Sequence, residues 1–103
     1  MALKKKIYEG IDNDPSNGMS DTGRIIRDAW AFGLLPETET CKGWNDQRIS
    51  ALWEQTQEEW RKYDYKVGGL PEDILERYMR IQKSWIERAK EKGWDPSIDP
   101  NDE

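Results

Sequence analysis

The chain has 103 residues, a net charge of −5, six tryptophans, one cysteine and no histidine. This length suits one small domain. A single cysteine excludes an internal disulfide, and the lack of histidine removes the commonest general base and metal ligand. Apolar residues make up 35% of the chain, below the ~45–50% of an average globular protein. The aromatic rings offset this shortfall, since each buries roughly 150–250 Å².

The negative charge is concentrated at the carboxyl end. Residues 46–92 carry ten basic and ten acidic side chains, whereas residues 93–103 carry four acidic side chains and no basic one. A neutral central region with an acidic end lacks the basic surface that phosphate backbones require, so we expect no nucleic-acid partner. The opening Met1–Lys6 has no apolar run after it, and the run Ala29–Leu35 is too short to cross a bilayer. We therefore expect a cytoplasmic protein without a membrane partner.

Residues 1–19 are predicted to form a flexible N-terminal arm, because residues 12–18 are almost all turn formers. A first helix should begin at Ser20 or Asp21, which are both good N-cap residues. Its apolar positions have helical spacing, namely Ile25, Ile26, Ala29, Trp30 and Phe32. Gly33 should end it, with Leu34 following and Pro36 shortly beyond.

Two longer helices are predicted between Asn45 and Gly93, joined by the turn Gly68–Pro71. Asn45 is a strong N-cap, and Trp44 and Ile49 occupy the two positions of a hydrophobic staple. The apolar stripes repeat with a helical period, as Ile49, Leu52, Trp53, Thr56, Trp60, Tyr63 and as Ile74, Leu75, Tyr78, Ile81, Gln82, Trp85, Ile86, Ala89. Gly93 should end the third helix in the way that Gly33 ends the first.

These elements predict an all-α domain over residues 20–94, built on an antiparallel helical hairpin. The short first helix should cover the groove that the two longer helices share. Residues 95–103 contain two prolines and four acidic side chains, so we expect a disordered acidic tail.

The aromatic side chains divide into two groups. Trp30, Trp53, Trp60 and Trp85 fall on apolar helical faces and are predicted to lie in the core. Trp44, Tyr65 and Trp94 stand at helix ends or in the connection, where a small domain leaves side chains uncovered. Tryptophan and tyrosine commonly anchor protein interfaces, so these three are the candidate anchors for a partner. Arg77 and Arg80 of the third helix are the candidate polar contacts.

The remaining polar residues carry no recognisable chemistry. Arg24, Arg27 and Asp28 are expected on the solvated side of the first helix, and Cys41 has no histidine partner to activate it. No residue is predicted to be catalytic and no cofactor is predicted. The stretch Asp12–Asp21 resembles a calcium loop at its first, third and fifth positions, but Asn17 and Gly23 occupy the places of the required glycine and glutamate.

Two functional hypotheses follow from these observations. The first is a small non-catalytic protein-interaction module that binds another protein or itself, because surplus aromatic area is combined with an absence of catalytic motifs. The alternative is a regulatory protein that binds a metal or small ligand through the Asp12–Asp21 loop.

Overall fold

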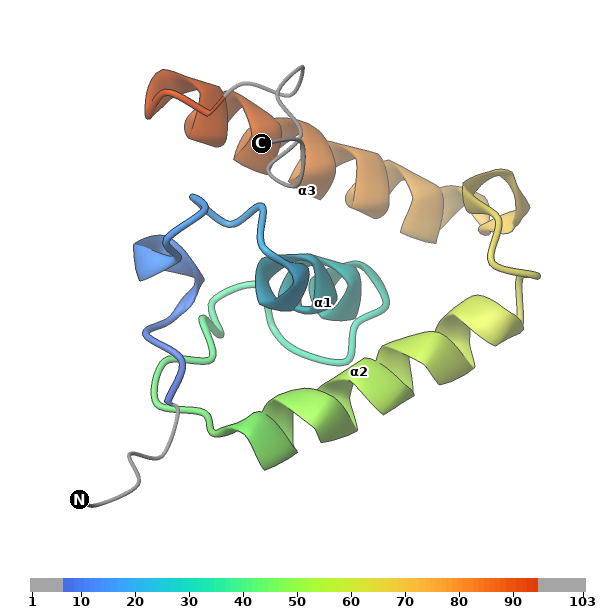
Figure 1. The fold of residues 1–103 in the computed structure, drawn as a ribbon. Helices are drawn as coiled ribbons and strands as arrows, with labels where there is room; N and C mark the ends of the chain where they lie inside the picture. Colours follow the sequence, from blue (N-terminus) through green and yellow to red (C-terminus); the bar gives the residue numbers. More distant parts are fainter. Residues whose placement is uncertain (1–6, 95–103) are drawn as a thin grey trace, which may run out of the picture.

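The computed structural model of the chain describes residues 7–94 (Figure 1). It contains three α-helices, α1 (Asp21–Ala31), α2 (Asp46–Arg61) and α3 (Glu72–Glu91), and two single 3-10 turns, η1 (Ile11–Asn13) and η2 (Val67–Gly69). No strand occurs in this part of the chain, where the only extended pairing is an isolated antiparallel bridge between Ile7 and Asn45. The predicted all-α fold is therefore confirmed. The predicted acidic tail lies outside the described residues.

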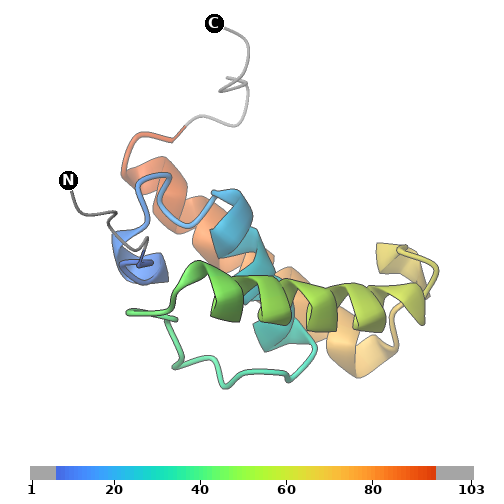
Figure 2. The same cartoon turned by 60° about the horizontal axis from the view of Figure 1, so that its bottom comes forward.

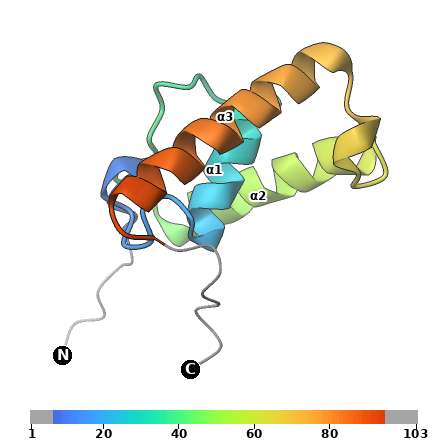
Figure 3. The ribbon, with the colours of Figure 1, turned by 90° about the horizontal axis from the view of Figure 1, so that it is seen from above.

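The two long helices form a V, with α1 placed between them (Figures 1 and 3). The connection through η2 closes the narrow end of the V, and α1 packs against both α2 and α3. The apolar stripes of the two long helices therefore face α1. The shortest helix is the central one, and it has to bury two opposite sides.

The helix boundaries follow the local signals in the sequence. The side chains of Ser20 and Asn45 accept hydrogen bonds from the backbone N–H groups of Gly23 and Arg48, as N-cap residues do. After α1, Gly33 has a φ of 75° and the N–H of Leu34 donates to the carbonyl of Ala29 over 2.9 Å. Gly93 and Trp94 repeat this arrangement after α3, with Trp94 donating to Ala89 over 2.9 Å. Both predicted stops are confirmed.

The core lies where α1 meets its neighbours. Its buried members come from every described segment except the α2–α3 connection, namely Ile11, Ile26, Ala29, Trp30, Ala31, Cys41, Leu52 and Ile81. Trp85 packs against this cluster, and its ring centroid lies 5.8 Å from that of Trp30. Trp60 is also buried, nearer the narrow end of the V, and meets Phe32 edge to face at 5.1 Å. The predicted core positions of Trp30 and Trp60 are confirmed, while Trp85 is half-buried at the edge of the core.

The segment predicted as a flexible arm packs against the helices from residue 7 onward. The N–H of Tyr8 donates to the carbonyl of Trp44, and the N–H of Gly43 donates to the carbonyl of Tyr8, both over 2.8 Å. The side chain of Ile11 is only 1% exposed. A free arm would leave this isoleucine in water, and burying it against α1 and α3 favours the packed arrangement.

Two glycines allow the arm to cross the start of α1. Gly18 has a φ of 85°, and a side chain there would meet the ring of Trp85. A Cβ atom on Gly23 would meet the backbone of Gly18. Close backbone approach of this kind requires glycine, so residues 18 and 23 determine how the arm lies on α1.

The segment between α1 and α2 runs around the outside of the domain before returning to the start of α2 (Figure 2). Besides its backbone bonds with the arm, side chains of α1 and α3 hold it at two points. The indole N–H of Trp30 donates to the carbonyl of Glu39 over 3.0 Å, and the guanidinium of Arg80 donates to both carboxylate oxygens of Glu37 at 3.0 and 2.8 Å. None of the helices among residues 7–94 is both long enough and apolar enough to cross a membrane.

The burial of Ile11 predicts that the arm contributes to stability. Ile11→Ala should lower the free energy of unfolding by about 2–5 kcal/mol, the usual cost of truncating a buried isoleucine. Ile7→Ala is the matched control, because Ile7 is 44% exposed and should change stability by no more than about 0.5 kcal/mol. Urea unfolding followed by tryptophan fluorescence measures both values. Equal, small effects would show that the arm does not belong to the folded core.

Candidate functional site

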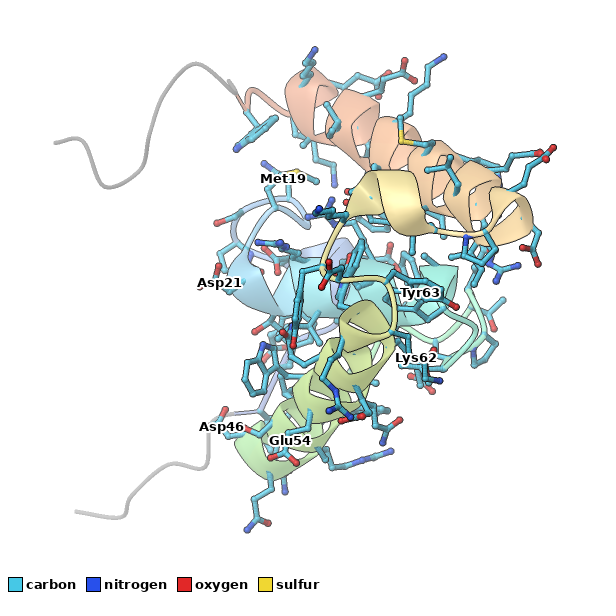
Figure 4. The ribbon with its side chains drawn as sticks, turned by 90° about the vertical axis from the view of Figure 1, so that its right-hand side faces the viewer. Met19, Asp21, Asp46, Glu54, Lys62 and Tyr63 are labelled. Atoms are coloured by element: carbon cyan, nitrogen blue, oxygen red, sulfur yellow. The ribbon has the colours of Figure 1, made fainter. Side chains whose placement is uncertain are left out.

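A cleft of about 370 Å³ opens beside α1, between α2 and the α2–α3 connection. Figure 4 views the molecule from this side. Asp21 marks the amino end of α1, Tyr63 lies over its carboxyl end, and the connection passes in front of the helix. Residues from all three helices and from the connection line the cleft. We refer to it below as the α1 cleft.

Large apolar side chains form the rim of the α1 cleft. Trp53 is 48% exposed, Tyr65 is 58% exposed, and Val67 is also exposed. Deeper in the cleft, Trp60 and Tyr78 meet edge to face with ring centroids 5.7 Å apart. Four aromatic rings from α2, α3 and the connection thus surround one opening, and two of them are available to a partner.

The prediction that Trp53 lies in the core is wrong. On α2 the buried positions are Leu52, Thr56 and Trp60, which are spaced by four residues and face α1. Trp53 follows Leu52 directly and is therefore turned about 100° around the helix axis. Since α3 lies on the far side of α1, it does not cover this face of α2, and Trp53 borders the cleft instead.

Tyr65 reaches the rim through an unusual backbone conformation. Asp64 and Tyr65 have φ values of 61° and 59°, a left-handed region that non-glycine residues seldom adopt. The N–H of Tyr65 donates to the carbonyl of Trp60 over 3.0 Å. This bond ends α2 and directs the chain across α1, which places the exposed Tyr65 ring beside Trp53 and Val67 on the cleft lining.

The floor of the cleft contains a buried carboxylate. Asp28 is only 5% exposed, and its Oδ2 atom accepts a hydrogen bond from the indole N–H of Trp60 over 3.1 Å. Burial raises the pKa of this carboxyl group, while the Trp60 hydrogen bond and the nearby charges of Arg24 and Arg27 act in the opposite direction. Within residues 7–94, Asp28 makes no other side-chain hydrogen bond and belongs to no ion pair.

The prediction of a solvated polar side on α1 is wrong for Arg27 and Asp28, which are both buried. The reason is that α1 lies inside the V and has partners on two sides. Arg27 donates to the side-chain oxygen of Gln82 on α3, while Asp28 accepts from Trp60 on α2. Burial lowers the pKa of Arg27, and its Nε atom has no hydrogen-bond partner among the described residues. Of the three polar residues, only Arg24 is exposed, and it lines the cleft.

The five predicted partner contacts do not form one surface. Tyr65 lies on the rim of the α1 cleft. Trp44 is half-buried, packs against the core and lies 3.9 Å below the guanidinium of Arg48, while Trp94 is half-buried just after α3. Arg77 donates to the carbonyl of Ala31 over 2.9 Å, and Arg80 pairs with Glu37. Both arginines thus help to hold α3 against neighbouring segments.

The Asp12–Asp21 loop uses its carboxylates within the protein. Asp14, predicted in a solvated turn, is buried and accepts hydrogen bonds from the Tyr8 hydroxyl over 2.6 Å, the Ser16 N–H over 2.7 Å and the Ser20 hydroxyl. Asp12 pairs with Arg88 on α3 at 3.0 Å. Across the described part of the chain, no three acidic or cysteine side chains are grouped as metal ligands would be.

The sequence of α1 carries no signal for the burial of Arg27 and Asp28. Ile25, Ile26, Ala29 and Trp30 form one apolar stripe, and Arg24, Arg27 and Asp28 lie on the opposite side of the helix. The burial of Arg27 and Asp28 depends on how α2 and α3 pack against that polar side, which the pattern of α1 does not reveal. Comparison of the chain with models of protein families, with curated proteins and with solved structures finds no match.

The buried thiol of Cys41 should be unreactive. Desolvation raises its pKa to about 12, and only the thiolate form attacks disulfides. At pH 8 the native protein should react with a disulfide reagent about a thousandfold more slowly than the urea-unfolded chain, because so little thiolate is present. The rate of thiol release measures this, with the unfolded chain as the control. Equal rates would contradict the burial of Cys41.

The raised pKa of Asp28 predicts a pH-dependent effect of Asp28→Asn. Because the folded-state pKa lies above the ordinary 3.8, the folded protein holds the Asp28 proton more tightly than the unfolded chain does. The stability gained from this proton is fully present below pH 3.8 and is lost as the pH rises through the folded-state pKa. Asparagine stays neutral and keeps an oxygen for Trp60. Relative to wild type, Asp28→Asn should therefore be more favourable for stability at pH 7 than at pH 3.5.

Urea unfolding at the two pH values tests this expectation. Asp46→Asn, at an exposed position on α2 outside the cleft, reports the effect of losing one surface charge. A larger stability advantage of Asp28→Asn at pH 3.5 than at pH 7 would contradict the direction of the pKa shift.

Proposed function

We propose that the chain is a small, non-catalytic cytoplasmic protein-interaction module, and that its partner docks on the α1 cleft. The observation that carries the proposal is the exposed aromatic rim formed by Trp53 and Tyr65. Tryptophan and tyrosine dominate the binding energy of protein interfaces because they bury large rings at low entropic cost. A cleft that combines such a rim with a few polar groups at its floor is typical of a recognition site.

Energetic considerations support a role for the rim beyond folding. Two large rings left half-exposed contribute less to stability than buried ones would, because apolar burial contributes roughly 25 cal/mol per Å². The left-handed conformation of Tyr65 adds a further backbone cost. A partner that covers both rings would recover the unused burial.

The alternative function, metal or small-ligand regulation through the Asp12–Asp21 loop, has less support. Asp14 receives its hydrogen bonds from protein donors and Asp12 pairs with Arg88, so a cation would have to break these contacts. Nucleic acid is also disfavoured as a partner, since Asp21 and Asp28 both line the cleft and would repel phosphate. A second copy of the chain remains within the proposal.

Alanine substitution on the rim tests the proposal. Trp53→Ala and Tyr65→Ala should each weaken partner binding at least tenfold, since interface anchors of this type contribute more than about 1.4 kcal/mol. Because both side chains are exposed, Tyr65→Ala should change the free energy of unfolding by no more than about 0.5 kcal/mol. The partner is first captured with tagged wild-type protein and identified, and its affinity for each variant is then measured by calorimetry.

Met79→Ala is the matched control, because Met79 is a large exposed hydrophobic residue on α3 outside the α1 cleft. It should leave the affinity unchanged. Sedimentation equilibrium of the wild type and the variants shows whether the partner is a second copy. Equal losses of affinity in all three variants would overturn the proposal, and parallel losses of stability and binding in Tyr65→Ala would show that Tyr65 is a folding residue.

A further inference from the structure

The carboxylate at the floor of the α1 cleft forms no ion pair with any residue of the described range 7–94. Asp28 is at least nine-tenths buried and lines the cleft. Its Oδ2 atom is occupied by Trp60, and its Oδ1 atom accepts no hydrogen bond from the described residues. A buried carboxylate is costly unless each oxygen finds a donor or a cation. Unlike the buried Nε atom of Arg27, this oxygen is not sealed from solvent, so it is open to a donor that enters the cleft.

The two nearest cationic side chains, those of Arg27 and Arg24, do not donate to this oxygen. Arg27 is turned toward α3 and donates to Gln82, and no salt bridge joins it to Asp28. Arg24 is exposed and also forms no ion pair among the described residues. Arg24 acts on Asp28 through its charge without a hydrogen bond, so the second carboxylate oxygen stays open to another donor.

Above the floor, the aromatic rings give the cleft flat apolar walls. Trp53 and Tyr65 stand on the rim, and Tyr78 stands beside the floor. The faces of such rings attract cations electrostatically. Residues 7–94 contain this contact twice, with Arg48 lying 3.9 Å above the ring of Trp44 and Arg88 lying 4.4 Å above the ring of Trp85.

We infer that the α1 cleft receives an arginine side chain of the partner protein, which donates to Asp28 and stacks against Trp53 and Tyr65. This inference rests on the proposed function and names the chemistry that the partner presents. A guanidinium fits better than an ammonium for two reasons. It is planar and stacks on aromatic faces, and it is weakly hydrated, so its transfer from water to a buried carboxylate costs less.

The probe that tests the inference is the peptide acetyl-Gly-Gly-Arg-Gly-Gly-amide. Its neutral counterpart carries citrulline, which keeps the shape of arginine and lacks its charge. The readout is the indole N–H resonance of Trp60 in ¹⁵N–¹H spectra, because this group donates to Asp28. The arginine peptide should shift this resonance saturably with a Kd on the order of 1 mM, as expected for a single anchored side chain. The citrulline peptide should bind at least tenfold more weakly.

Two substitutions should change this affinity in opposite directions. Asp28→Asn should weaken binding of the arginine peptide at least tenfold. Arg24→Gln should tighten it by a few fold, because it removes a like charge from the cleft lining. Asp46→Asn, an exposed aspartate outside the cleft, loses the same charge and should have no effect. Thermal unfolding of each variant confirms that it is folded.

The outcomes separate this inference from the proposed function. Any of three results would overturn the arginine site. The arginine and citrulline peptides could bind equally, or Asp28→Asn could leave the affinity unchanged. The third is the absence of a saturable shift at 10 mM peptide, which is about ten times the expected Kd. If the partner still requires Trp53 and Tyr65 in that case, the docking proposal stands alone. If the arginine peptide binds as expected while the partner ignores Trp53→Ala and Tyr65→Ala, the arginine site stands and docking on the aromatic rim is wrong.

Discussion

The position of α1 between the two longer helices is the constraint on which the rest of the structure depends. An eleven-residue helix with neighbours on opposite sides has to bury residues on both of those sides. It therefore buries polar side chains together with apolar ones, and those polar groups need partners on both neighbours. Arg27 donates to Gln82 of α3, and Asp28 accepts from Trp60 of α2. Two adjacent residues of α1 therefore bond the helix to both sides of the V.

The same arrangement explains why the segments outside the helices are packed. A helix placed inside a V leaves the wide end open, and the apolar residues there would face water. Ile11 of the arm and Cys41 of the α1–α2 segment fill this end and join the core around Trp30. The narrow end is closed by the short α2–α3 connection. What remains uncovered is the flank of α1 between α2 and that connection, which is the α1 cleft.

Local features of the fold were predictable from the sequence, and features that depend on the packing of α1 were not. Ser20, Asn45, Gly33 and Gly93 act through bonds to residues a few positions away, so their identity is enough to place the helix ends. Trp53 was misplaced because the helical period shows only that α2 has an apolar side. It does not show how much of that side α1 covers. Asp28 was misplaced because the polar side of α1 was assumed to face water, whereas α2 and α3 cover part of it.

Of the candidate site, Tyr65 was identified because it stands in a connection, where side chains often stay uncovered, and the structure places it on the cleft rim. The floor of the site could not be deduced in this way. It depends on Trp60 and Asp28, which are 32 positions apart in the chain and meet only because α1 and α2 pack together. Since the bond to Trp60 occupies one oxygen of the Asp28 carboxylate and no described residue bonds to the other, the interaction that holds the two helices together also shapes the floor of the proposed site.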